Sequence, residues 1–269
     1  MAEKWRVMCL GPGETQTEDA SRFALERGYP CGVCGRFSFA VDPEDVFSDF
    51  DWLDRPQEPL WAGEKPGPRF NVAPTQPAVV FGQRAGAAPK PARFDWGFVP
   101  RWAKDQKGAA RRANARSESI SERPMFADSF RARRCLVPVT GWFEWRVGGA
   151  DRRPVHFHQE GRLMTLAGVW DRCALPGGAP IFTFAIRTRP SVGAPTEVHH
   201  RMPVVVGEAG RAAWLDPTQT VEVAAVERLD APLVLTTVST RVNSVRYDDP
   251  RCLEPDAGFG EDAQKDLFR

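Results

Sequence analysis

The sequence lacks long hydrophobic runs, and this absence limits where the protein can reside. No apolar segment approaches the roughly 20 residues that a membrane-spanning helix needs. Glu3, Glu14 and Glu18 interrupt any apolar core that a secretory signal would require near the N-terminus. The chain of 269 residues is 42% apolar and 26% charged, which is typical of globular proteins and excludes wholesale disorder. We therefore expect a cytoplasmic globular protein with no membrane partner.

Cysteine is scarce too, and its spacing argues against a disulfide framework and against a metal site. Six cysteines in a chain of this length are too few to staple a fold, so we expect reduced thiols. Cys31 and Cys34 form a C-x-x-C pair, but no second pair accompanies it and the four histidines lie far along the chain. A dithiol redox site would require a βαβ context, which the pattern does not provide. We predict no metal and no cofactor.

The chain also has little net charge, +1 at pH 7, but its charges are unevenly distributed. Residues 1–60 hold 6 Lys and Arg against 12 Asp and Glu, whereas residues 91–146 hold 12 against 6. A cationic middle segment favours a local anionic ligand, although on charge alone a solvated surface is the simpler interpretation. Arginine outnumbers lysine 30 to 6, and the planar guanidinium suits phosphate oxygens.

Short apolar segments with alternating polarity predict a β-rich protein. The expected strands are residues 37–41, 78–81, 136–139, 154–158, 163–169, 181–186, 202–206 and 234–238, and residues 141–145 continue the strand 136–139 past a glycine. Short helices are expected after Asp42 and over 128–134 and 211–215, with a loop over 53–68 and an exposed excursion over 103–125. Many short strands with few helices predict an α+β fold whose antiparallel strands form a closed or nearly closed sheet.

The polar residues 1–33 differ in character from the rest of the chain, with Gly11-Pro12-Gly13 as a breaker and no clear periodicity. We interpret residues 1–33 as an N-terminal extension, residues 34–256 as a single domain, and residues 257–269 as a polar C-terminal tail.

Glu144 is the first candidate for catalysis, because it lies between aromatic side chains on a predicted strand. Partial desolvation by Trp142, Phe143 and Trp145 would raise the pKa of the carboxyl and suit it to moving protons. The alternative is an edge-strand carboxylate paired with Arg146.

Histidines supply two further candidates. His199-His200-Arg201 places two imidazoles and a guanidinium just before an apolar strand, which favours a functional site, although a structural role stays open. His156 and His158 share one face of a predicted strand, and we interpret them as a satisfied surface pair.

Arginines and tryptophans alternate along the cationic segment. Asn114-Ala115-Arg116-Ser117-Glu118 lies between Trp102 and Trp145 in the sequence. Single-stranded nucleic acid is bound by this combination, because guanidinium groups pair with phosphates while aromatic rings stack on bases. Each tryptophan alone is weak evidence, since tryptophan is also common in protein cores.

Read together, the motifs of the chain carry a specific resemblance. They are Cys34-Gly35-Arg36-Phe37, Arg69-Phe70-Asn71-Val72-Ala73-Pro74-Thr75, Trp96-Gly97-Phe98-Val99-Pro100-Arg101-Trp102, Asn114-Ala115-Arg116-Ser117-Glu118, Arg134-Cys135-Leu136-Val137-Pro138, Gly141-Trp142-Phe143-Glu144-Trp145, Ala167-Gly168-Val169-Trp170, His199-His200-Arg201-Met202-Pro203, Val238-Ser239 and Val242-Asn243. In this order they resemble the SOS response-associated peptidase (SRAP) family over roughly residues 34–256. Each motif is modest evidence, whereas the ordered set is highly specific.

The resemblance implies a β-rich pseudo-barrel flanked by short helices, with a positively charged groove. It implies recognition of abasic sites in single-stranded DNA, a stable thiazolidine crosslink to the lesion through an N-terminal cysteine, and self-processing that removes the residue before that cysteine. The site residues follow from the matching motifs. Cys34 would be the nucleophile, Glu144 would move protons, His199 would protonate the sugar oxygen, and Asn114 would hold the cysteine. Arg36, Arg116 and Arg201 would contact phosphates, Trp102 and Trp145 would contact bases, and Asn71 would line the site.

The chemistry depends on a free α-amine at Cys34. An amine with a pKa near ~8 condenses with the aldehyde of a ring-opened abasic sugar, and the thiol of the same residue closes a five-membered ring. In the family the cysteine follows the initiator methionine, whereas here 33 residues precede it. We expect a start at Val33, since its GTG codon is a common bacterial start. Cleavage between Val33 and Cys34, or a retained extension on an inactive or merely DNA-binding protein, are the alternatives.

The leading hypothesis is therefore a monomeric, nucleoid-associated sensor that crosslinks to abasic sites in single-stranded DNA. Two rival functions stay open. A cysteine peptidase acting on a separate protein would not need phosphate contacts. A non-covalent single-stranded DNA-binding module would not need Cys34.

Overall fold

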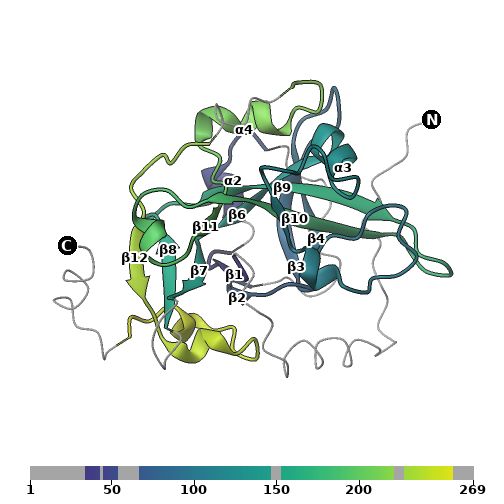
Figure 1. The fold of residues 1–269 in the computed structure, drawn as a ribbon. Coiled ribbons are helices and arrows are strands. Elements are labelled where there is room, and N and C mark those ends of the chain that lie inside the picture. Colours follow the sequence, from purple (N-terminus) through teal and green to yellow (C-terminus); the bar gives the residue numbers. More distant parts are fainter. Residues whose placement is uncertain (1–33, 43–44, 54–66, 147–152, 221–226, 257–269) are drawn as a thin grey trace.

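The computed structural model describes residues 34–42, 45–53, 67–146, 153–220 and 227–256, which fold into two β-sheets (Figure 1). The seven-stranded sheet contains β3 (Pro77–Gly82), β4 (Lys90–Trp96), β5 (Asn114–Arg116), β6 (Arg134–Val139), β9 (Met164–Cys173), β10 (Ile181–Pro190) and β11 (Arg201–Pro203). The five-stranded sheet contains β1 (Arg36–Phe39), β2 (Arg69–Val72), β7 (Gly141–Trp145), β8 (Pro154–His158) and β12 (Val234–Thr237). The predicted extension 1–33 and tail 257–269 lie outside the described residues.

Five strands of the larger sheet close into a barrel. The order β10-β4-β3-β6-β9 returns to β10, because β9 also pairs with β10. Closure leaves these strands with neighbours on both sides. The predicted α+β fold with a closed, β-rich barrel is confirmed. The prediction that the strands are antiparallel holds for most pairs but not for β4 and β5, which pair with β10 in parallel.

Short helices flank the barrel. They are α2 (Val46–Asp49), α3 (Ala127–Ala132), α4 (Glu208–Leu215) and the 3-10 helices η1 (Ala109–Arg112), η2 (Ala194–Glu197), η3 (Thr240–Asn243) and η4 (Pro250–Cys252). Helix α4 lies across the top of the barrel in Figure 1, and the indole of its Trp214 donates a 2.8 Å hydrogen bond to the carbonyl of Cys135 in β6. The expected excursion 103–125 is only partly exposed, because β5 pairs with β10 and Ile120 is buried.

Residues 136–145 do not form one continuous strand, contrary to the sequence prediction. Strand β6 ends at Val139 in the barrel and β7 begins at Gly141 in the other sheet. Glycine is required at this corner, since a β-carbon at Gly141 would collide with the ring of His156 and the carbonyl of Phe157. The close approach lets the chain pass from one sheet to the other within a single residue, Thr140.

His156 and His158 share one face of β8, but they are not the surface pair that we expected, since only His158 is partly exposed. His156 is buried, a 2.9 Å hydrogen bond joins its Nε2 to the hydroxyl of Ser38, and its ring stacks on that of His158. Burial, followed by the nearby His158, lowers the pKa of His156 to about 3. His156 therefore stays neutral in the folded protein at every pH where the unfolded chain titrates.

The lowered pKa of His156 predicts a loss of stability in mild acid. The unfolded chain binds a proton near pH ~6.5, whereas the folded protein binds it only near pH 3. Stability is thus fully present above pH ~6.5 and falls as the pH drops toward 3. We expect urea unfolding to show that His156→Gln removes about 1 kcal/mol of the loss between pH 7 and 5.5. An equal loss in both proteins would contradict this role.

Candidate functional site

The pairing of strands β1 and β7 in the five-stranded sheet brings Cys34 and Glu144 close together. Strand β1 pairs with β7 so that Arg36 faces Phe143 and Phe37 faces Trp142. Cys34 precedes β1 by two residues, and its backbone nitrogen donates a 2.6 Å hydrogen bond to Glu144 Oε1. Both residues are buried, Glu144 being only 2% exposed. Residues 110 positions apart in sequence therefore meet inside the protein.

Burial shapes the ionisation of both groups. Burial raises the pKa of Glu144 to about 8. The hydrogen bond from Cys34 lowers this pKa, but burial has the larger effect. Burial also raises the pKa of the Cys34 thiol well above its usual range, and the nearby Glu144 carboxylate adds to this effect. At neutral pH the thiol is protonated and the carboxyl is poised to hold or release a proton.

Two further predicted residues lie at the same centre. Nδ1 of His199 is 4.0 Å from Glu144 Oε1, and burial lowers the pKa of this imidazole. The Asn114 amide donates a 3.3 Å hydrogen bond to the carbonyl of Cys34. Strand β5, which carries Asn114 at its first position, and the turn before β11, which carries His199, thus bring all four predicted catalytic residues together. Strand β7 lies between β8 and β1, so Glu144 is not the edge-strand carboxylate of the alternative interpretation.

Cys34 also has an unusual backbone conformation. Its φ angle is +46°, in the left-handed region that residues other than glycine seldom occupy. Such a conformation costs about 1–2 kcal/mol for an L-residue and is often found at functional sites.

The predicted DNA contacts differ in exposure. Trp102 is 65% exposed, the largest exposure of any large apolar side chain in the described part of the chain, and Arg116 is exposed. Trp145 is half-buried, with its indole nitrogen donating to Asn243 Oδ1 at 2.6 Å and the Arg36 guanidinium lying over its ring. Trp102 and Arg116 are thus exposed, whereas Arg36 is half-buried and its guanidinium donates hydrogen bonds to the carbonyls of Val242 and Asn243.

Asn71 departs from the prediction that it lines the site. It is completely buried, and its amide donates to the carbonyls of Val242, Ser244 and Tyr247. Its Oδ1 accepts from Arg36 at 2.9 Å. The Asn71 side chain therefore holds residues 242–247, the C-terminal segment, against β2 through its hydrogen bonds. A DNA strand cannot reach this side chain without rearrangement.

The loop that carries Trp102 is anchored by a residue that sequence reasoning missed. The buried carboxylate of Asp171 accepts from the backbone nitrogen of Arg101 at 2.9 Å, and its other oxygen contacts the guanidinium groups of Arg101 and Arg133. The sequence offered one indication of a role for Asp171, which is that it directly follows the Ala-Gly-Val-Trp motif that ends at Trp170.

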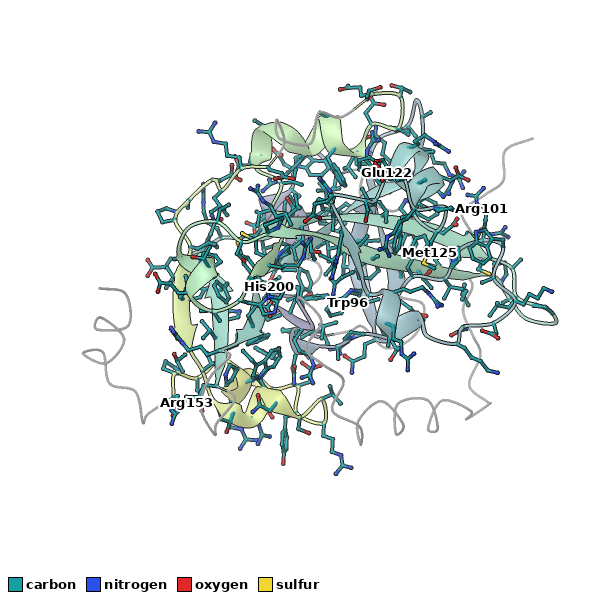
Figure 2. All side chains as sticks on the ribbon, viewed as in Figure 1. Trp96, Arg101, Glu122, Met125, Arg153 and His200 are labelled. Carbon is teal, nitrogen blue, oxygen red and sulfur yellow. The ribbon has the colours of Figure 1, made fainter. Side chains whose placement is uncertain are left out.

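Arg201 is buried and paired, unlike the free phosphate ligand that the sequence suggested. Its guanidinium makes a two-point contact with the carboxylate of Glu118, the last residue of the Asn114-Ala115-Arg116-Ser117-Glu118 motif, to which the sequence had assigned no role. Figure 2 labels the neighbouring His200 near the middle of the molecule and Glu122 toward α3.

Two features are absent from the described residues. Within that part of the chain no three His, Cys, Asp or Glu side chains group together as metal ligands. No helix there is long and apolar enough to cross a membrane. Cys31 of the C-x-x-C pair lies outside the described residues.

Comparison with known proteins matches residues 33–245 to the family described as SOS response associated peptidase (SRAP). The chain is 29% identical over 228 residues to the abasic site processing protein YoqW of Bacillus subtilis, across 82% of this chain and 99% of that one. It is 29% identical over 261 residues to the abasic site processing protein HMCES of Gallus gallus, across 83% and 78%. A crystal structure of a Bacteroides thetaiotaomicron protein shares the fold with a TM-score of 0.67 at 21% identity, covering 83% of this chain and all of that one.

Proposed function

The chain belongs to the SRAP family, and from this membership and the geometry of the site we propose that it recognises abasic sites in single-stranded DNA and joins to them covalently through Cys34. The observation that carries the proposal is the 2.6 Å contact between the Cys34 nitrogen and the buried Glu144 carboxyl. A nitrogen that must act as a nucleophile needs a nearby group to accept its proton, and this contact supplies one.

The reaction has two bond-forming steps that balance without a cofactor. The α-amine of Cys34 attacks the C1′ aldehyde of the ring-opened sugar, and loss of one water leaves an imine. The thiol then adds across the C=N bond, with sulfur bonding to carbon and the proton going to nitrogen. The product is a five-membered thiazolidine that links protein and DNA.

Each neighbour of Cys34 has a role that its position allows. Glu144 accepts a proton from the attacking amine and returns one as water leaves, for which its raised pKa suits it. His199 protonates the ring oxygen of the sugar as the aldehyde forms. Asn114 holds the Cys34 carbonyl and so orients the amine.

The proposal requires Cys34 to be the first residue of the active protein. The requirement follows from the chemistry, because only a residue with a free α-amine can form the imine. A start at Val33 or self-cleavage after it would both supply the free amine.

The DNA contacts are proposed for exposed and half-buried residues around the site. Arg116 and Arg36 would pair with phosphates, while Trp102 and Trp145 would contact bases beside the lesion. One chain carries all of these groups, so we propose a monomer acting at the nucleoid.

The proposal is tested by the intact mass of the protein expressed from its native gene, before and after mixing with an abasic single-stranded oligonucleotide. We expect a species that begins at Cys34 and gains the mass of the DNA less water. A full-length protein that stays unmodified would remove Cys34 from the catalytic residues and leave a DNA-binding protein. Cleavage of other proteins without any DNA adduct would favour a peptidase.

A further inference from the structure

The exposed carboxylate of Glu118 forms an ion pair with the buried Arg201, beside the proposed reacting centre. Glu118 Oε1 and Oε2 accept from Arg201 Nη1 and Nη2 at 2.6 and 2.9 Å, the two-point geometry of the strongest ion pairs. The side chain of Arg201 is 8% exposed and that of Glu118 is 47% exposed. The hydrogen bonds from Arg201 lower the pKa of Glu118 to about 2, so the pair is fully charged at neutral pH.

Both partners are held to the same point of the barrel. Arg201 Nη2 donates to the carbonyl of Thr188 in β10 at 3.0 Å. The backbone nitrogen and the hydroxyl of Ser117 donate to that carbonyl as well, at 2.8 and 2.7 Å. Glu118 therefore stands at a defined place, and it ties the end of β5 to the start of β11.

The pair extends toward the catalytic histidine through the backbone. Nδ1 of His199 lies 3.2 Å from the backbone nitrogen of Arg201 and 3.1 Å from its carbonyl oxygen. The same Nδ1 is 4.0 Å from Glu144 Oε1. A shift of Arg201 would thus turn the imidazole relative to Glu144 and Cys34.

A carboxylate at this place opposes DNA binding. Glu118 is two residues from Arg116, which we place on the phosphate-contacting surface, and its charge contributes to the field of that surface. Removing a repulsive charge from a binding surface strengthens the binding of an anion. If the Glu118 carboxylate weakens DNA binding, we look for its role in its contact with Arg201 instead.

We propose that Glu118 is a positioning residue, which fixes Arg201 and through its backbone the imidazole of His199, at the expense of DNA affinity. The inference rests on the proposed crosslinking function. If Glu118 is a positioning residue, its removal raises DNA affinity but slows crosslinking. If it were a DNA contact, its removal would lower the affinity.

The test compares Glu118→Gln with wild type, both expressed from the full gene. Affinity is measured on a single-stranded oligonucleotide with a tetrahydrofuran in place of the abasic sugar, which has no aldehyde and cannot crosslink. The rate is measured in single turnover on the true abasic oligonucleotide at saturating protein. We expect affinity to rise about threefold and the crosslinking rate to fall on the order of tenfold to 100-fold.

Two further variants control the test. Glu122→Gln removes the same charge from the same exposed segment without touching Arg201, and we expect it to crosslink at the wild-type rate. If Glu118 acts through Arg201, the double variant Glu118→Gln/Arg201→Lys crosslinks no more slowly than Arg201→Lys alone.

The outcomes are distinguishable. An unchanged rate in Glu118→Gln, beside a wild type that crosslinks, overturns this inference alone, and weaker affinity at an unchanged rate makes Glu118 a DNA contact. A rate loss shared by Glu122→Gln also overturns it, as a general charge effect. A wild type that forms no crosslink overturns the proposed function and this inference with it.

Discussion

Replacing Cys34 with serine is expected to abolish every heat-stable adduct with an abasic oligonucleotide. Serine retains the α-amine, so an imine can still form, but a hydroxyl is a much weaker nucleophile than a thiol and gives no stable ring. The thiol is completely buried, so affinity for the tetrahydrofuran oligonucleotide should stay within about twofold of wild type. Denaturing gel electrophoresis measures the adduct and fluorescence anisotropy measures the affinity.

Borohydride adds a second readout to the Cys34→Ser experiment, because it reduces an imine to a stable amine. If translation starts at Val33, the variant still exposes its α-amine and borohydride traps it on the DNA. If the Cys34 thiol cleaves the preceding peptide bond, the variant keeps its extension and nothing is trapped.

The control is Cys173→Ala, which removes a buried thiol on β9 that faces the carbonyl of Ala103. We expect it to crosslink like wild type. A heat-stable adduct from Cys34→Ser at the wild-type level would show that another group attacks the lesion.

Most strands could be predicted from the local pattern of apolar residues. The segments 78–81, 154–158 and 181–186 alternate or concentrate apolar residues, and all three are strands in the structure. Strand β4 was missed because Lys90-Pro91-Ala92-Arg93 has low β propensity, and it becomes a strand because it closes the barrel between β3 and β10.

The candidate catalytic residues could be named from their motifs, but their contacts could not. Cys34 and Glu144 meet because β1 and β7 pair in one register, and a shift of one residue would turn Glu144 to the other face. The sequence contains no local signal of that register. It depends instead on long-range packing, including the close approach of Gly141 to His156.

The roles of charged and amide residues were the least predictable from sequence. Asn71 and Arg201 have the residue types of DNA ligands, yet one fastens the C-terminal segment and the other is paired with Glu118. Residue type specifies what a side chain can bind, while burial and partners decide what it does bind. Glu118 lay inside a recognised motif without any hint of its partner, since that partner is 83 positions away.

Glu144→Gln should slow crosslinking by roughly 10²- to 10⁴-fold, the usual worth of a general acid–base group. The amide keeps an oxygen that accepts from the Cys34 nitrogen, so the fold and DNA affinity should be preserved. It cannot take a proton from the attacking amine, which must then lose its proton to water. The variant's rate should therefore rise with pH up to the pKa of the amine near ~8, while wild type shows an additional ionisation from Glu144. Single-turnover rates between pH 6 and 9 measure both profiles.

The same substitution separates catalysis from stability, because the two effects have opposite signs. The pKa of Glu144 is raised to about 8 in the folded protein, so the stability that its protonated form contributes is present below pH ~4.5 and is lost as the pH rises through 8. Glutamine does not ionise and loses nothing over this range. We therefore expect the unfolding free energy of Glu144→Gln, relative to wild type, to rise by on the order of 2–4 kcal/mol between pH 5 and 8.5 when both are compared as full-length chains, in which the Cys34 nitrogen is an amide. A variant that instead loses stability as the pH rises, or that crosslinks at the wild-type rate, would show that Glu144 does not exchange the proton of Cys34 from a buried, desolvated position.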